Sequence, residues 1–199
     1  MITNDVNIAS QYVKNGEVIV FPTDTLYAIG GDVFNEDTFN KIYRIKERPS
    51  DKSLIILIEN LNQLFKLVDN ISITEEKLCN TFWPGALTIV FKANKNIPKY
   101  LVNDDNTVAI RMPNNKRTLE LIKLANTPLL APSANKSGIK PENSIYEIEN
   151  NFKNDISLFL KSDQNILENE PSTIIRLIND QVNIIREGKI KKEDLLKVL

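Results

Sequence analysis

The stretch that decides the fold is Val18-Ile19-Val20-Phe21-Pro22-Thr23-Asp24-Thr25-Leu26-Tyr27, which runs on into Ala28-Ile29-Gly30-Gly31. Its first four residues are apolar and predict a buried strand over 18–21. The strand then gives way to hydroxyls, a carboxylate and a tyrosine. Because ligands collect at such strand ends in α/β sheets, the stretch predicts a site as well as a strand. A turn in which Thr and Asp side chains cap backbone groups is the alternative interpretation.

Outward from this stretch, helical and strand patterns alternate along the chain. Helices are predicted over 7–15, 35–46, 61–68, 74–82 and 116–125, and strands over 54–58, 87–91, 107–111, 156–160, 173–178 and 182–185. The last two strands can pair across Asn179-Asp180-Gln181. Asn35 is predicted to cap the second helix, and Thr74 the fourth, with Glu75 and Glu76 behind it. The C-terminal segment 189–197 is basic and predicts a solvated helix face.

Composition bounds the class of protein. The chain has 199 residues, 42% hydrophobic and 26% charged, which suits one globular α/β domain. One cysteine, Cys79, allows no intramolecular disulfide and is most simply explained by packing in an apolar helix. The N-terminal residues 1–5 show no signal-peptide pattern, and no stretch approaches the roughly 20 apolar residues of a membrane span. These features favour a reducing, cytoplasmic location.

Several kinds of site are excluded because the residues or motifs that they require are missing from the sequence. There is no histidine, which removes Ser-His-Asp triads, Cys-His pairs, His metal sites and imidazole acid–base chemistry. Neither G-x-x-x-x-G-K-[ST] nor G-x-G-x-x-G occurs, so a nucleotide would have to be held by cationic side chains and polar turns. The net charge of −1 argues against a surface that coats nucleic acid, while leaving room for a local basic patch.

Arginine usage points to candidate anion sites. The chain has 19 Lys but only six Arg, and arginine serves where bidentate phosphate or carboxylate binding is needed. Arg48, Arg111 and Arg186 fall at helix or strand ends beside Pro, Gly or polar turns. Surface salt bridges are the alternative for each.

Two short motifs add polar groups. Lys46-Glu47-Arg48-Pro49 sets two cations two residues apart where a helix ends, although cations are common at helix C-termini. In Ser133-Ala134-Asn135 the first and third side chains face the same way if the segment is extended.

Together these motifs resemble the YrdC/TsaC family of proteins. Lys46-x-Arg48 with Ser133-x-Asn135 matches the family's K-x-R…S-x-N tetrad. The family's other landmarks follow in order over about residues 7–190: the 21–27 stretch, Trp83-Pro84-Gly85-Ala86-Leu87-Thr88, Val108-Ala109-Ile110-Arg111-Met112-Pro113, 131–138, Pro171-Ser172-Thr173-Ile174 and Arg186-Glu187-Gly188. Some positions depart from the pattern: Ala28 and Ala86 replace the usual Gly and Pro, Ser53 replaces a Pro, and Leu57 stands where some relatives carry His.

The resemblance implies a fold and an activity. The expected fold is α/β, a single YrdC-like domain over 1–199 without the additional C-terminal domain of the family's longer form. It would have one twisted mixed sheet with flanking helices and a concave cationic cleft. The implied enzyme is an L-threonylcarbamoyladenylate synthase, a nucleotidyltransferase that condenses L-threonine, bicarbonate and ATP and releases pyrophosphate. A downstream tRNA threonylcarbamoyltransferase complex would then modify adenosine 37, so this is the first step of t6A formation.

The resemblance also implies roles for individual residues. The tetrad Lys46, Arg48, Ser133 and Asn135 would be catalytic. ATP would be bound by these four together with Lys52, Pro141 and Arg186, and threonine by Thr23, Thr25, Tyr27, Leu57, Thr107, Arg111, Ala131 and Ser172. Mg²⁺ is expected with ATP, bound mainly by phosphates and water rather than by a protein site, and Asp24 is the only carboxylate in a motif that could reach it.

Two other functions compete with the synthase. An RNA-binding or ribosome-maturation module of the same fold is one, although the near-zero net charge and 7% aromatic content argue against a dedicated RNA binder. A cationic cleft built for ATP would still attract RNA weakly. The other is the YrdC-like module of larger carbamoyltransferases. Those proteins carry zinc-finger or acylphosphatase-like regions, for which a chain with one cysteine and no histidine has no residues or room.

Overall fold

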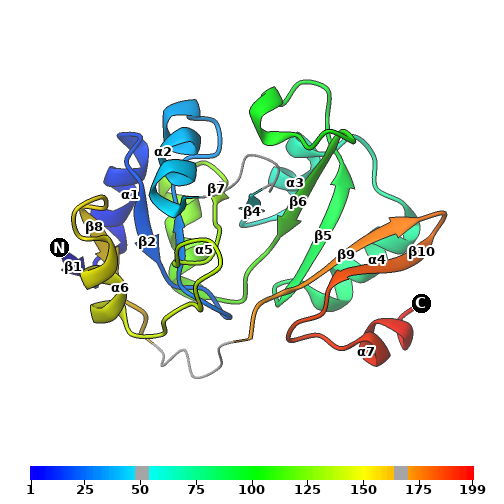
Figure 1. The fold of residues 1–199 in the computed structure, drawn as a ribbon. Coiled ribbons are helices and arrows are strands. Elements are labelled where there is room, and N and C mark those ends of the chain that lie inside the picture. Colours follow the sequence, from blue (N-terminus) through cyan, green and yellow to red (C-terminus); the bar gives the residue numbers. More distant parts are fainter. Residues whose placement is uncertain (48–53, 164–169) are drawn as a thin grey trace.

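The computed structural model describes residues 1–47, 54–163 and 170–199, and its strands form two mixed sheets that lie side by side with helices around them (Figure 1). In this part of the chain the smaller sheet has the order β1-β8-β2-β3 and the larger the order β10-β9-β5-β6-β4-β7. The strands are β1 Ile2–Thr3, β2 Ile19–Phe21, β3 Ala28–Gly30, β4 Ile55–Leu57, β5 Leu87–Lys92, β6 Thr107–Arg111, β7 Leu129–Leu130, β8 Leu158–Leu160, β9 Thr173–Ile178 and β10 Gln181–Arg186. The helices are α1 Val6–Lys14, α2 Glu36–Lys46, α3 Leu61–Leu67, α4 Ile73–Phe82, α5 Lys116–Ala125, α6 Ile145–Phe152 and α7 Lys192–Leu196, with a 3₁₀ turn at Lys99–Leu101.

The predicted α/β class and mixed pairing are confirmed, but the single sheet is wrong. The two sheets meet where β3 faces the 128–134 segment. Isolated bridges join Ala28 with Ser133 and Asp32 with Leu129, and backbone hydrogen bonds run between them, such as Ile29 N–H to the carbonyl oxygen of Pro132 (2.9 Å). A Cβ on Gly30 would lie 1.6 Å from the carbonyl oxygen of Leu130, so the close approach at this seam requires glycine. β7 itself has only two residues, and the backbone hydrogen bonds of the seam extend beyond it on both sides.

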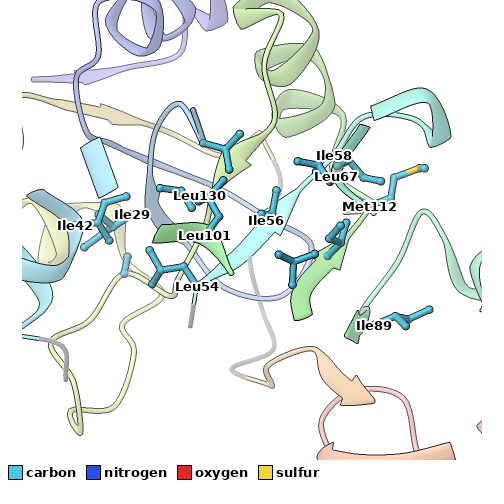
Figure 2. Packing of buried hydrophobic residues seen from close by; sticks show 14 of the residues in the cluster. Ile29, Ile42, Leu54, Ile56, Ile58, Leu67, Ile89, Leu101, Met112 and Leu130 are labelled. Atoms are coloured by element: carbon cyan, nitrogen blue, oxygen red, sulfur yellow. The ribbon is translucent and has the colours of Figure 1, made fainter. Parts of the chain in front are cut away.

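One hydrophobic cluster nevertheless continues through both sheets. Figure 2 shows it running from Ile29 and Ile42 on one side, past Leu130 and Ile56, to Met112 on the other. A second cluster lies beneath α1 and α5, which pack against each other, and includes Leu57 of β4. Burial of this apolar surface holds the two sheets together.

Local signals explain where the helices next to the site begin and end. The Asn35 side chain accepts a hydrogen bond from the backbone N–H of Thr38 (3.0 Å), which confirms the predicted cap of α2. This helix ends at Lys46, and Glu47 follows in the left-handed conformation at φ 51°. The predicted cap of α4 is wrong: Ser72, not Thr74, forms a reciprocal capping box with Glu75. Ser72 precedes Glu75 by three residues, the spacing that a capping box requires, whereas Thr74 is adjacent to it.

The last two predicted strands do pair. β9 and β10 form an antiparallel hairpin whose turn residues Asn179 and Asp180 have φ values of 51° and 59°, the conformation of a two-residue hairpin turn. The register shifts between Ile184 and Arg186, so β10 carries an irregularity just before Arg186. The C-terminal helix is less solvated than predicted, because Leu195 of α7 is fully buried.

Cys79 lies in the core, as the sequence predicts, at 2% exposure on α4. Burial, with smaller contributions from Glu75 and Glu76, raises the pKa of its thiol to about 12, so the thiol stays protonated near neutral pH. None of the helices in the described part of the chain is long and apolar enough to cross a bilayer.

Candidate functional site

A pocket of about 200 Å³ lies where the two sheets meet, and we call it the Arg111 pocket. Strand ends and turns from both sheets contribute its walls. They are Thr23, Thr25, Leu26, Tyr27 and Ala28 after β2, Ile55 and Leu57 of β4, Arg111 at the end of β6, Ala131, Ser133 and Pro141 after β7, and Pro171, Ser172 and Arg186 around β9 and β10. Seven of the eight residues expected to bind threonine line it.

Arg111 is the most strongly organised group of the pocket. It is 4% exposed, and its guanidinium donates from Nε to the carbonyl oxygen of Gly85 (2.9 Å) and from Nη1 to Oγ1 of Thr25 (2.9 Å). Nη2 forms a short ion pair with the carboxylate of Asp24. Burial lowers the pKa of Arg111, while Asp24 opposes that change. Three of the five N–H groups are therefore committed, and the other two have no partner within the described residues.

The turn after β2 is both a capped turn and a wall of the pocket, so the two interpretations of its sequence hold together. Oγ1 of Thr23 donates to the carbonyl oxygen of Leu26 (2.6 Å) and accepts from the backbone N–H groups of Thr25 and Leu26 (3.1 Å each). It also lies 3.0 Å from Oγ1 of Thr25. Thr118 of α5 donates its hydroxyl to the carbonyl oxygen of Pro22 and fastens the start of the turn. Thr23 thus fixes the shape of the turn. Thr25, whose hydroxyl contacts Thr23, in turn accepts the hydrogen bond from Arg111.

Tyr27 presents its ring to the pocket and anchors its hydroxyl elsewhere. The hydroxyl oxygen accepts from the backbone N–H of Ser162 (3.0 Å). Burial raises the pKa of Tyr27, against the effect of the Ser162 N–H, so the group stays a neutral phenol at physiological pH.

The opposite wall is built from the start of β9 and the end of β10. Arg186 donates from Nε and Nη2 to the carbonyl oxygen of Ser172 (3.2 and 2.8 Å), and from Nη2 to its Oγ (3.2 Å). The Ser172 hydroxyl also lies 2.8 Å from Oγ1 of Thr88, a fully buried residue of β5. The sequence predicts Ser172 and Arg186 as site residues, but it assigns no role to Thr88.

Three members of the predicted tetrad meet in one turn. Lys46 is 1% exposed, and its ammonium donates to the backbone carbonyl oxygens of Ser133 and Asn135, both at 2.5 Å. The Ser133 hydroxyl donates to Oδ1 of Asn135 (2.5 Å), whose Nδ2 donates to the carbonyl oxygens of Lys136 and Ile139. Lys46 therefore binds the turn itself, and the expected contact of its ammonium with ATP phosphates stays a prediction. Arg48, Lys52 and Ser53 lie outside the described residues.

A second pocket of about 250 Å³ adjoins the first, because Ile55, Ser133 and Arg186 line both. Thr107 lies in this second pocket and not in the Arg111 pocket, so it is separated from the other seven residues expected to bind threonine. Its hydroxyl donates to Oδ1 of Asp105 (2.6 Å). That hydrogen bond, followed by the ion pair with Arg176, lowers the pKa of Asp105.

The acidic groups near the pockets are engaged by protein partners. Asp24 pairs with Arg111 and Asp105 with Arg176. Within residues 1–47, 54–163 and 170–199, no three His, Cys, Asp or Glu side chains gather as a metal site would require. The sequence does not predict that Asp24 pairs with Arg111. The position of Asp24 next to Thr25 in the motif is the signal that could have indicated this pair.

Known proteins resemble this chain in sequence and in fold. Residues 11–188 match the Sua5/YciO/YrdC family model, which carries the description "Telomere recombination". A Pyrococcus abyssi protein named threonylcarbamoyl-AMP synthase is 33% identical over 194 residues, covering 98% of this chain and 57% of the relative. A Pseudoalteromonas translucida protein of the same name is 36% identical over 173 residues, covering 85% of this chain and 91% of the relative. The crystal structure of P. abyssi Sua5 complexed with L-threonine superposes with a TM-score of 0.94 at 31% identity, covering all of this chain and 61% of that one. The chain thus spans less than two thirds of the archaeal relative's length.

Proposed function

This chain belongs to the Sua5/YciO/YrdC family, and on that premise we propose that it condenses L-threonine, bicarbonate and ATP to threonylcarbamoyl-adenylate and releases pyrophosphate. The observation that carries the proposal is the Arg111 pocket. Residues from five separated segments of the sequence, expected to bind one amino acid, line a single cavity of about 200 Å³. The threonine complex of the P. abyssi relative, which has the same fold, supports this assignment.

The pocket has the chemistry of an amino-acid site. The two uncommitted N–H groups of Arg111 suit a carboxylate, and the three bonds to Gly85, Thr25 and Asp24 hold the guanidinium in place before a ligand arrives. Leu26, Leu57 and Ala131 supply an apolar wall that suits a side-chain methyl group.

The proposed reaction requires no histidine and no covalent enzyme nucleophile. The carbamate formed from threonine and bicarbonate carries an anionic oxygen, which would attack the α-phosphorus of ATP. A bond from the carbamate oxygen to phosphorus forms as the bond from phosphorus to the bridging oxygen of pyrophosphate breaks. The protein would align the two anions and neutralise the charge that develops on the phosphates.

The second pocket is the proposed nucleotide side of the site. Thr107, Ser133 and Arg186 line it, and Arg186 would bring a cation to the junction where the two substrates meet. Arg48 and Lys52 remain the proposed phosphate ligands, and Pro141, which lines the Arg111 pocket, remains a proposed nucleotide contact. We assign Lys46 a positioning role, because its ammonium orders the Ser133–Asn135 turn through backbone carbonyls.

Mg²⁺ is proposed to arrive with ATP. Asp24 is bound by Arg111, and the described residues hold no acidic cluster, so these residues do not fit a dedicated metal site. Phosphate oxygens and water are the ligands that Mg²⁺ accepts in such cases, and the ion would neutralise phosphate charge. The adenylate would pass in the cytoplasm to a transferase that acts on adenosine 37 of tRNA.

The test is direct. The protein is incubated with α-labelled ATP, L-threonine and bicarbonate, and threonylcarbamoyl-AMP is sought by mass spectrometry. Arg111→Gln should abolish the product. Arg44→Gln is the matched control, because Arg44 is an exposed arginine of α2 that lines neither pocket, and it should leave product formation unchanged. Wild-type protein that makes no adduct with all three substrates present would refute the proposal.

A further inference from the structure

Thr88 has no place in the site as described so far, yet it contacts the pocket wall. It lies on β5, is fully buried, and its Oγ1 is 2.8 Å from Oγ of Ser172, 84 residues away in the sequence. Distance alone does not say which of the two hydroxyls donates. The surroundings of the two oxygens decide it.

The Thr88 hydroxyl has a single hydrogen-bond acceptor among the described residues. Within the described residues, Oγ of Ser172 is its only hydrogen-bond partner. If Ser172 donated, the Thr88 proton would be left in the core without an acceptor, which costs about 1–3 kcal/mol. If Thr88 donates, no buried proton is stranded. That difference favours Thr88 as donor by roughly 5- to 150-fold.

The consequence falls on Ser172. Its oxygen then accepts from Thr88 (2.8 Å) and from Nη2 of Arg186 (3.2 Å), which occupies both lone pairs. The Ser172 hydroxyl proton is left over, and Ser172 lines the Arg111 pocket. Within the described residues Oγ of Ser172 has no further hydrogen-bond partner, so its proton can serve an acceptor in the pocket.

We propose that Thr88 is a positioning residue, which donates to Ser172 and thereby fixes the Ser172 hydroxyl as a hydrogen-bond donor to the pocket's ligand. The inference rests on the proposed function for the identity of that ligand. With Arg111 and Arg186 lining the same pocket, Ser172 adds a neutral donor to a cationic wall, which suits a carboxylate or carbamate oxygen of the amino acid and disfavours its ammonium group.

A pair of substitutions at Thr88 tests the role. Thr88→Val keeps the volume but removes the donor, and Thr88→Ser keeps the donor. Thr88→Val is expected to weaken threonine binding about tenfold, with ATP binding unchanged, because one orientation-dependent hydrogen bond of roughly 1.4 kcal/mol is lost. Thr88→Ser should restore the wild-type affinity. Equal losses for both substrates, or no rescue by Ser, would overturn the proposal and leave Thr88 as a core residue only.

A double-mutant cycle with Ser172→Ala asks whether Thr88 acts through Ser172. Once the Ser172 hydroxyl is absent, Thr88→Val should cause no further loss of threonine affinity, measured by titration calorimetry. Additive losses in the double variant would mean that Thr88 acts by another route.

An NMR measurement separates this inference from the proposed function. A buried, donating Thr88 hydroxyl should give a proton signal that exchanges slowly with water and shows a nuclear Overhauser effect to Ser172. Wild-type protein that binds no threonine but shows this proton would refute the proposed function and leave the bond direction established. A Thr88 hydroxyl proton that exchanges fast would refute the bond direction, whatever the ligand.

Discussion

Lys46 and Arg111 are both buried cations at the end of a regular element, and they differ in what they bind. Lys46, 1% exposed, ends α2 and donates to backbone carbonyl oxygens of the Ser133–Asn135 turn. Arg111, 4% exposed, ends β6 and donates to a carboxylate, a hydroxyl and one carbonyl oxygen. Each would be a phosphate or carboxylate ligand by residue type alone.

The difference shows that the shape of a buried cation and its partners decide what it binds. A compact ammonium surrounded by carbonyl oxygens organises the backbone that surrounds it, so Lys46 acts on the shape of the turn. A planar guanidinium with five N–H groups can satisfy three fixed partners, as Arg111 does, and still have two N–H groups, which we propose bind the ligand. Four substitutions test this contrast, in order of expected effect.

The largest effect is expected from Asp24→Ala. Removing this carboxylate leaves the Arg111 guanidinium buried without its counter-ion, which should lower the free energy of unfolding by about 3–5 kcal/mol in urea denaturation. The control is Glu47→Ala, which removes the carboxylate of the exposed Lys136–Glu47 pair and should cost under about 1 kcal/mol. Equal losses in the two variants would mean that burial of the Arg111 pair has no energetic consequence.

Lys46→Met should have the next largest effect. The carbonyl oxygens of Ser133 and Asn135 lose a charged donor, so the free energy of unfolding is expected to fall by about 2–3 kcal/mol. ATP affinity should fall while threonine affinity is retained, as calorimetric titration with each substrate would measure. Lys136→Met changes an exposed lysine of the same turn and serves as the control. Loss of threonine affinity alone in Lys46→Met would contradict the contrast with Arg111.

Arg111→Lys separates the effect of the guanidinium's planar shape on threonine affinity from the effect of its charge. A lysine keeps the positive charge but cannot reproduce the planar fork that bonds to Gly85 and Thr25, so threonine affinity should fall about tenfold, or roughly 1.4 kcal/mol. Arg44→Lys, on an exposed face of α2, should leave that affinity unchanged. Wild-type affinity in Arg111→Lys would show that charge alone suffices.

Asp105→Asn tests the exposed counterpart of the Arg111–Asp24 pair and should have the smallest effect. Asp105 and Arg176 have side chains 47% and 36% exposed, so the pair should contribute under about 1 kcal/mol. The Thr107 hydroxyl, and then Arg176, lower the pKa of Asp105 below its ordinary 3.8. Its stabilisation is therefore fully present above pH 3.8 and is lost as the pH falls through the folded-state value. The gap between wild-type and variant stability should stay constant near neutral pH and shrink in acid, which urea denaturation at several pH values would measure.

Much of the fold could be predicted because its signals are local. Asn35 precedes Glu36 and Asp37, and the bounds of α2 follow from that cap and from the apolar stripe behind it. α5 matches its predicted bounds for similar reasons. β3 was missed because it has only three residues, Ala28–Gly30, which are too few to show a period.

The site could be predicted only in part. The motifs named nearly every residue that lines the Arg111 pocket. They did not place Thr107 in the adjoining pocket. They include Thr88 at the end of the Trp83–Thr88 motif but give it no role, because a buried threonine in an apolar strand looks like any other core residue. Its contact with Ser172 joins residues 84 apart and leaves no trace in local spacing.

The sequence by itself determined which residue types exist, where most of the longer helices and strands form and which motifs stand at their ends. It thereby excluded histidine chemistry and provided the carboxylates, hydroxyls and arginines of the site. Only the tertiary structure decided the partners, since Lys46 meets Ser133 and Asn135 across 87 and 89 residues, and Arg111 meets Asp24 across 87. The physical reason is that helix and strand formation depends on neighbours in the chain, whereas a buried charge is satisfied by whichever polar groups the packing brings within hydrogen-bond distance.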